Sequence, residues 1–146
     1  MSAHSDDVRV QRIVDFFEQL QLEDLKRLGD LYTADAAFKD PFNEVCGVAA
    51  IEKVFVHMFR SLDRPRFAVG DVLVQGDQCF LSWQFIFRLK RSSGNELRVR
   101  GASHLLLAVD GRIRVHRDYW DAAEELYEKL PLLGALMRWL KRRVNA

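Results

Sequence analysis

The feature that most constrains the fold is a change of hydrophobic period near Arg66. Before that residue, apolar side chains recur every three or four positions, which predicts helices over residues 8–22, 25–32 and from Gly47 to a stop at Pro65. After it, apolar residues alternate, and turn signals separate four predicted strands, at 67–74, 79–89, 97–109 and 113–119. The order predicts an α+β domain in which three helices cover one face of a curved antiparallel sheet.

Helical spacing returns in the segment 122–146. Leucines and Trp139 lie on one side of it, and Arg138, Lys141, Arg142 and Arg143 supply positive charge. A basic amphipathic helix can lie on an anionic membrane surface, but more often it packs its apolar stripe on its own domain. We favour the packed helix. We expect one domain over residues 1–146, with 122–146 as a C-terminal helical extension.

Composition excludes several classes of function. The chain has 146 residues, 49% of them hydrophobic, which suffices for one substantial core. Its 22 basic and 21 acidic residues give a net charge of +1, so no global charge attracts nucleic acid. No apolar run approaches the roughly 20 residues that span a bilayer. We therefore expect a cytoplasmic protein that binds no nucleic acid.

Asp40 is the first candidate for chemistry, because it ends an extended segment and precedes Pro41. If its side chain points inward, Phe38, Phe42 and Val45 would remove water from the carboxylate and favour its use as a general base. The alternative is a turn cap, since aspartate before proline is common turn chemistry. The local sequence favours the cap.

The second candidate is the predicted strand end at 115–121. Alternation puts His116, Asp118 and Trp120 on one face of the strand. A histidine two residues from an aspartate on one face lies within its reach, so the carboxylate can orient or charge the imidazole. A purely structural pair is an equal alternative.

Four motifs together resemble a known family. They are Tyr-x-x-Asp-Ala-x-Phe-x-Asp-Pro at 32–41, Gly-x-x-x-Ile at 47–51, Asp-Gly-Arg-Ile at 110–113 and Asp-Tyr-Trp-Asp at 118–121. In this order, the chain is similar from about residue 8 to 127 to the SnoaL-like and ketosteroid-isomerase-like group of the nuclear transport factor 2 (NTF2-like) superfamily. The resemblance implies a curved sheet around a cone-shaped apolar pocket, and a homodimer formed through the outer face of the sheet.

The resemblance transfers only part of the isomerase site. Asp40 stands where the ketosteroid isomerases have their general base. Phe16 stands at the position of their oxyanion tyrosine, and the pair Ser103 and His104 at that of their protonated aspartate. Because Phe16 cannot donate a hydrogen bond and Ser103 is a weaker donor than a carboxylic acid, steroid isomerisation is disfavoured.

The aromatic strand end also resembles limonene epoxide hydrolase. Asp118 would inherit the role of the aspartate that helps to activate water there. That hydrolase has an Arg and an Asp on an inner strand, where this chain has residues 82–85, Ser-Trp-Gln-Phe. The second carboxylate is missing, so the epoxide mechanism is incomplete unless Asp40 replaces it.

These arguments give one candidate site. The predicted catalytic residues are Asp40, His116 and Asp118, and the predicted ligand contacts are Phe16, Tyr32, Phe55, Phe59, Trp83, Phe85, Ser103 and His104. We expect no cofactor, and the spacing of His57, His104 and His116 argues against a metal site. The predicted function is binding of a small, mainly apolar molecule, with proton-transfer chemistry of isomerase, cyclase or hydrolase type. The alternative is a non-catalytic ligand-binding or protein-interaction module.

Overall fold

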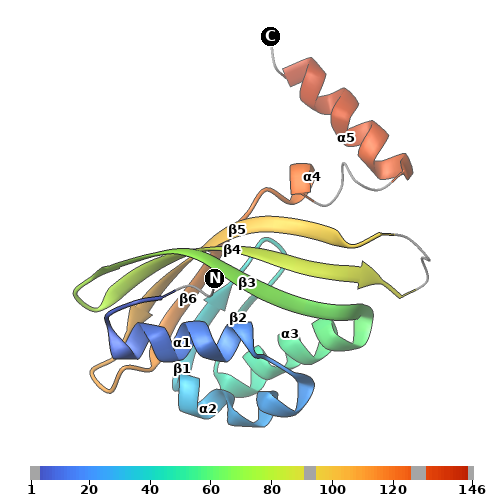
Figure 1. Cartoon of the computed structure of the whole chain (residues 1–146). Coiled ribbons are helices and arrows are strands. Elements are labelled where there is room, and N and C mark those ends of the chain that lie inside the picture. The colour runs from blue at the N-terminus through green and yellow to red at the C-terminus, as the bar shows by residue number, and fades with distance from the viewer. Residues whose placement is uncertain (1–3, 91–94, 126–130, 145–146) are drawn as a thin grey trace.

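The structure is a computed structural model that describes residues 4–90, 95–125 and 131–144 (Figure 1). The helices are α1 (Val8–Glu18), the 3-10 helix η1 (Leu22–Arg27), α2 (Leu28–Leu31), α3 (Val48–Ser61), α4 (Ala122–Glu125) and α5 (Pro131–Val144). The strands are β1 (Tyr32–Lys39), β2 (Glu44–Cys46), β3 (Leu62–Gln75), β4 (Gln78–Leu89), β5 (Leu97–Leu107) and β6 (Ile113–Tyr119). The fold class is α+β, as predicted.

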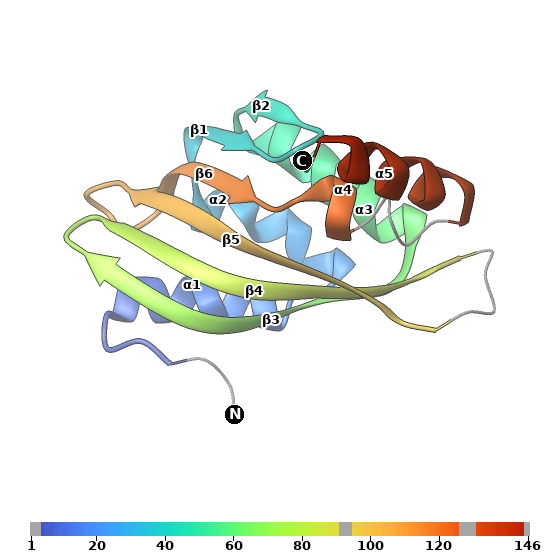
Figure 2. The ribbon, with the colours of Figure 1, turned by 90° about the horizontal axis from the view of Figure 1, so that it is seen from above.

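All six strands form one curved sheet in the order β2-β1-β6-β5-β4-β3, which Figure 2 shows from above. The helices α1, α2 and α3 cover one face of it (Figure 1). Each neighbouring pair is antiparallel except β1 and β6, which run parallel. The sheet is therefore mixed, whereas the sequence predicts an antiparallel one. The parallel pair sets Phe38 beside His116. β1, the first strand in the chain, thereby lies next to β6, the last one.

The first helix starts at Val8 as predicted, but the other helix bounds differ from the prediction. α1 begins after Asp7, whose side chain accepts from the Arg9 amide, and it ends at Glu18. The predicted second helix is a 3-10 turn followed by the single turn α2, and Tyr32 already belongs to β1. α3 ends at Ser61, and Pro65 lies within β3. Because β3 is an edge strand with a register shift at this point, the missing N–H of Pro65 is tolerated.

The core lies between the helices and the covered face of the sheet. Its fully buried side chains include Ile13 of α1, Leu28 of α2, Ile51 of α3 and Leu105 of β5. The apolar faces of the helices and of the sheet thus form one core.

The C-terminal segment differs from the packed helix that we favoured. α5 extends away from the sheet (Figure 1), and the side chains of Leu136, Trp139 and Leu140 are 50%, 45% and 40% exposed. α4 contacts β5, where the Glu125 carboxylate accepts hydrogen bonds from the backbone amide and guanidinium of Arg100. Residues 126–130 and 145–146 of the predicted extension lie outside the described residues. Within the described ranges, no helix is long and apolar enough to cross a membrane.

Candidate functional site

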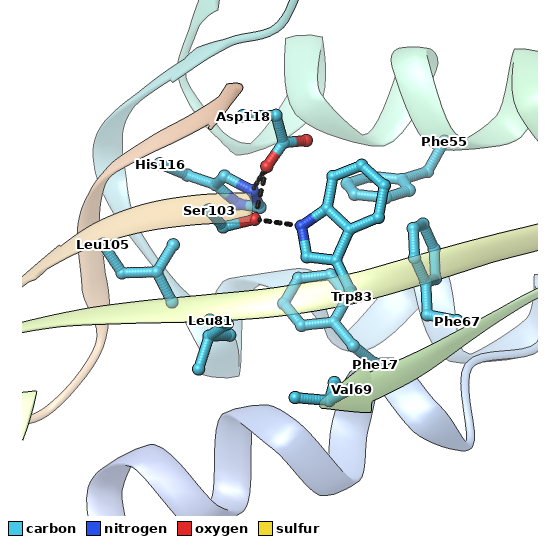
Figure 3. A pocket seen from close by; sticks show the side chains of 10 residues that line it. All are labelled: Phe17, Phe55, Phe67, Val69, Leu81, Trp83, Ser103, Leu105, His116 and Asp118. Atoms are coloured by element: carbon cyan, nitrogen blue, oxygen red, sulfur yellow. Dashed lines mark hydrogen bonds and ion pairs between the residues drawn. The ribbon is translucent and has the colours of Figure 1, made fainter. Parts of the chain in front are cut away.

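Five side chains from four strands form a continuous hydrogen-bonded chain, most of which Figure 3 shows. Tyr32 Oη lies 2.7 Å from His116 Nδ1, and His116 Nε2 lies 2.7 Å from Asp118 Oδ1. From the other side, Trp83 Nε1 donates to Ser103 Oγ at 2.8 Å, and Ser103 Oγ lies 2.5 Å from the same Asp118 Oδ1. We call these five residues the polar chain. Its centre is one carboxylate oxygen.

Strand register explains why the polar chain forms. β5 and β6 pair Ser103 with Asp118, and alternation turns both side chains toward the covered face of the sheet. β4 and β5 pair Trp83 with Gly101, and the indole lies against this glycine. A Cβ atom at Gly101 would stand 2.6 Å from the Cζ2 atom of the indole. The glycine therefore gives the Trp83 ring room to reach Ser103.

The positions of the protons follow from burial and donor chemistry. Burial raises the pKa of the Tyr32 hydroxyl well above its ordinary value, and the nearby Asp118 raises it further, so the hydroxyl keeps its proton. Among the described residues its partner is His116 Nδ1. If Nδ1 accepts, the ring proton is on Nε2 and is donated to Asp118. Because an indole can only donate, the Ser103 hydroxyl gives its own proton to Asp118.

The second oxygen of Asp118 is in a different situation. In the part of the chain that the structure describes, no donor is recorded at Oδ2, which points away from the hydrogen bonds in Figure 3. The Asp118 side chain is 17% exposed. Two donors thus fix the orientation of the carboxylate through Oδ1, and Oδ2 is left without a donor among the described residues.

Two cavities meet at Asp118. The smaller one, which we call the closed cavity for its volume of about 30 Å³, is lined by Phe17, Phe55, Phe67, Val69, Leu81, Trp83, Ser103, Leu105, His116 and Asp118. Such a volume holds about one or two water molecules and no organic ligand. The open cavity has about 470 Å³, within the ordinary range for small-molecule sites. Phe55, Phe67, Trp83 and Asp118 line both cavities, so Asp118 stands at their boundary.

Asp40 lies at the rim of the open cavity and is half-buried. Its Oδ1 accepts from the backbone amides of Phe42 at 2.8 Å and Asn43 at 2.6 Å, and the Asn43 side-chain amide adds a third donor at 3.1 Å. This is the turn cap that the local sequence favoured. The carboxylate faces the cavity, but its oxygen is already held by the turn.

The structure places some predicted ligand contacts at the cavities and others elsewhere. Phe55, Trp83, Phe85 and Ser103 line one or both cavities. Phe16 does not: it lies under the Arg27 guanidinium, 5.9 Å from the ring centre. The next residue, Phe17, lines the closed cavity in its place. Ungapped counting back from Asp40 crosses the 3-10 helix, and a difference of one position turns a helix by about 100°.

Three further predictions of ligand contact are corrected. Tyr32 is fully buried behind His116, with its ring stacked 5.9 Å away, and it lines neither cavity. His104 points to the opposite face of the sheet, where it stacks on Phe80 at 4.2 Å, because it alternates with Ser103. Phe59 packs against the core and is also outside both linings.

Sequence reasoning missed Phe17, Phe67, Val69 and Leu81 in the closed cavity, and Met58, Phe87 and Val99 among others in the open cavity. Their signal is present in the chain, since Phe17 belongs to the buried stripe of the first helix and Leu81 alternates in step with Trp83. His57, His104 and His116 lie in three different places. Within the described ranges, no cluster of His, Cys, Asp and Glu could hold a metal ion.

Comparisons with known proteins agree with this architecture. The family model of the SnoaL-like domain matches residues 13–116, so the chain belongs to the SnoaL-like family. No protein with a curated description matches it in sequence.

Solved structures with the same fold come from several bacteria. A putative SnoaL-like polyketide cyclase from Jannaschia is 16% identical, with a TM-score of 0.70 over 84% of this chain and 94% of that one. A protein of ketosteroid-isomerase-like fold from Catenulispora acidiphila, in complex with trimethylamine, is 15% identical, with a TM-score of 0.71 over 84% and 92%. An epoxide hydrolase from M. tuberculosis that resembles limonene epoxide hydrolase is 16% identical, with a TM-score of 0.68 over 91% and 96%. At these identities the likeness shows the fold alone.

Proposed function

We propose that the protein binds a small, mainly apolar molecule in the open cavity and that Asp118 exchanges a proton with it. One observation carries this proposal: Oδ1 of Asp118 is held by Ser103 and His116, Oδ2 has no donor among the described residues, and Asp118 lines a cavity of about 470 Å³. A base needs a fixed direction and an accessible lone pair, and this carboxylate has both.

The chemistry that suits this arrangement is removal of a proton from carbon next to a carbonyl. The C–H proton passes to Oδ2 of Asp118, and the electron pair of that bond moves into the carbonyl to form an enolate. Return of the proton to the same or another carbon completes an exchange or an isomerisation. Tyr32, His116 and Ser103 act on Asp118 and lie outside the lining of the open cavity, so they are positioning residues, whereas Trp83 also lines that cavity and can contact the substrate.

Asp118 replaces Asp40 as the proposed base. Oδ1 of Asp40 accepts from two backbone amides, and the Asn43 side-chain amide lies 3.1 Å from Oδ1 and 3.2 Å from Oδ2, so both oxygens of Asp40 are engaged in the turn. The fold is also compatible with this type of chemistry, because a cyclase and an epoxide hydrolase are named among the structures that share it.

Deuterium exchange tests the proposal without knowledge of the natural substrate. The protein is incubated in D₂O with 1-tetralone, a bicyclic ketone, and deuterium uptake at the carbon next to the carbonyl is followed by NMR. We expect exchange above the buffer rate that Asp118→Asn abolishes and Asp40→Asn largely retains. Asp71→Asn, an exposed carboxylate on β3, is the matched control. Exchange that survives Asp118→Asn would contradict the proposal.

A second candidate is a ligand-binding protein without catalysis. It is favoured by the donors of the closed cavity: Trp83, Ser103 and His116 already donate within the polar chain and leave none for a developing oxyanion. This candidate predicts that 1-tetralone shifts the NMR signals of the cavity residues while no deuterium enters the ketone.

A further inference from the structure

We infer that the ligand of the open cavity carries a positive charge: it is an amine or quaternary ammonium compound with an apolar body. This inference rests on the proposed binding function and adds the chemical class of the ligand. It follows from the charges and the rings that line the cavity.

The charged groups of the cavity have one sign. Among its described lining residues, the acids are Asp40 and Asp118, and none is lysine or arginine. The two carboxylates share one rim, because both also line the adjoining surface hollow beside Trp120. His57 is the one lining residue that could become cationic.

The nearest cations in sequence are engaged elsewhere. Lys39 precedes Asp40 but pairs with Glu44 at 3.0 Å. Arg117 precedes Asp118, and alternation turns it to the other face of β6, where its guanidinium lies 4.9 Å from the centre of the Tyr119 ring. Both cations line the adjoining hollow beside Trp120, but neither lines the open cavity. On the side of the open cavity, the two carboxylates therefore face no lysine or arginine among the described lining residues.

Aromatic side chains make up a large part of the wall of the open cavity. Eight rings line it, those of Phe38, Phe42, Phe55, Phe67, Trp83, Phe85, Phe87 and Trp120. Phe42 and Trp120 meet edge to face at 5.5 Å beside Asp40, and Phe67 and Phe85 stack at 4.8 Å deeper in. The faces of such rings attract cations, and they attract weakly hydrated organic ammonium groups in particular.

The rim carboxylates and the aromatic walls together favour a cationic ligand over a neutral or anionic one. An anion would meet two carboxylates across a medium of low dielectric constant and would be repelled. A neutral molecule would gain only the burial of its apolar surface. An ammonium group at the rim gains both the ring faces and the carboxylates, while its apolar body fills the cavity.

Three probes of one shape and different charge test the inference. They are 2-phenylethylamine, 2-phenylethanol and phenylacetate, titrated into the full-length protein by calorimetry at pH 7 and low salt. We expect the amine to bind at least about tenfold more tightly than the alcohol, and phenylacetate to bind most weakly. Equal binding of amine and alcohol would overturn the inference and leave the proposed binding function standing. Binding of none of the three would overturn both.

Variants locate the effect. Asp40→Asn keeps the acceptor oxygen of the turn and removes the charge, so it should lower the affinity for the amine more than the affinity for the alcohol. A circular dichroism spectrum like that of the wild type shows that the variant is folded. Asp71→Asn, which removes the charge of an exposed side chain on β3, should leave both affinities unchanged. An amine preference that neither Asp40→Asn nor Asp118→Asn reduces would exclude the rim carboxylates as its source.

Discussion

At the scale of the residue, the polar chain solves the problem of keeping polar groups inside an apolar core. Tyr32 and His116 are 0% and 4% exposed, and each would lose water on burial without a replacement. Each finds a partner at 2.7 Å. Among the described residues, no buried side-chain nitrogen or oxygen is without a hydrogen bond. Because each member is hydrogen-bonded to the next, removal of one side chain leaves its neighbour without a hydrogen-bond partner.

Tyr32→Phe tests this dependence. The variant keeps the ring and leaves His116 Nδ1 buried without a partner, so we expect a loss of about 1–3 kcal/mol in the free energy of unfolding. Nitrogen-detected NMR of the His116 ring should also show a change in tautomer. Tyr119→Phe, at a half-exposed ring, is the control and should change stability by less than about 0.5 kcal/mol. Equal losses in both variants would contradict a special role of the Tyr32 hydroxyl.

The sequence predicts part of this site and not the rest, for a physical reason. His116 and Asp118 share a face of one strand, so their proximity follows from the period of two alone. The contacts of Tyr32 with His116 and of Trp83 with Ser103 join different strands, and they depend on registers that no local pattern contains. For Asp40, the neighbouring residues are compatible both with a general base and with a turn cap, and the structure shows the cap.

At the scale of the element, strand spacing and helix capping decide where the site stands. Alternation in β4 and the turn signals around it are strong, so the predicted strand at 79–89 lies within one residue of the observed Gln78–Leu89. The bounds of the second helix differ from the prediction, because Leu28 and Leu31 have helical spacing over a single turn only. The parallel pairing of β1 with β6 had no signal in the chain either, since it joins segments far apart in sequence.

Gly101→Ala probes the packing of β4 on β5. An added Cβ would meet the indole of Trp83 and force it away from Ser103, so we expect a loss of about 1–3 kcal/mol in unfolding free energy and a shift of the tryptophan fluorescence. The control is Gly29→Ala in α2, where an added Cβ has no atom within 4 Å. That variant should be neutral or slightly stabilised. A neutral Gly101→Ala would show that the indole does not depend on this glycine.

The start of α1 predicts a dependence on pH. Hydrogen bonds from the Arg9 side chain, more than any other cause, lower the pKa of Asp7 from its ordinary 3.8 to about 2. Because the folded value is the lower one, the charged carboxylate stabilises the fold above pH 4, and this contribution is lost as the pH falls through about 2. Asp7→Asn keeps the cap without the charge. Its melting temperature should lie below that of the wild type at pH 5 and approach it at pH 2, measured by circular dichroism.

At the scale of the whole molecule, the described structure separates a compact domain from a protruding helix. Residues 4–90 and 95–125 contain the sheet, the helices on its covered face and both cavities. α5 stands apart with a half-exposed apolar side, and the Arg143 guanidinium lies 5.0 Å from the Trp139 ring centre. The predicted homodimer, the membrane-surface alternative and the cytoplasmic location stay predictions at this scale.

Deletion of residues 131–146 tests the independence of α5. Because its described apolar side chains gain little from burial, we expect the melting temperature to fall by less than about 4 °C, the shift that about 1 kcal/mol produces in a domain of this size. A larger fall would mean that α5 supports the domain. Co-sedimentation with anionic vesicles, compared between the full and shortened chains, decides the membrane alternative: binding that is unchanged by the deletion removes it.

The position of Asp118 between two cavities has an evolutionary consequence. The groups that orient its carboxylate come from the strands, while much of the outer chamber is walled by α3 and by the turn after β1. Under the proposed function, substitutions in α3 or in that turn would change which molecule binds and leave the hydrogen bonds to Asp118 in place. Descendants of one such protein could then acquire new ligands by changing the cavity wall alone.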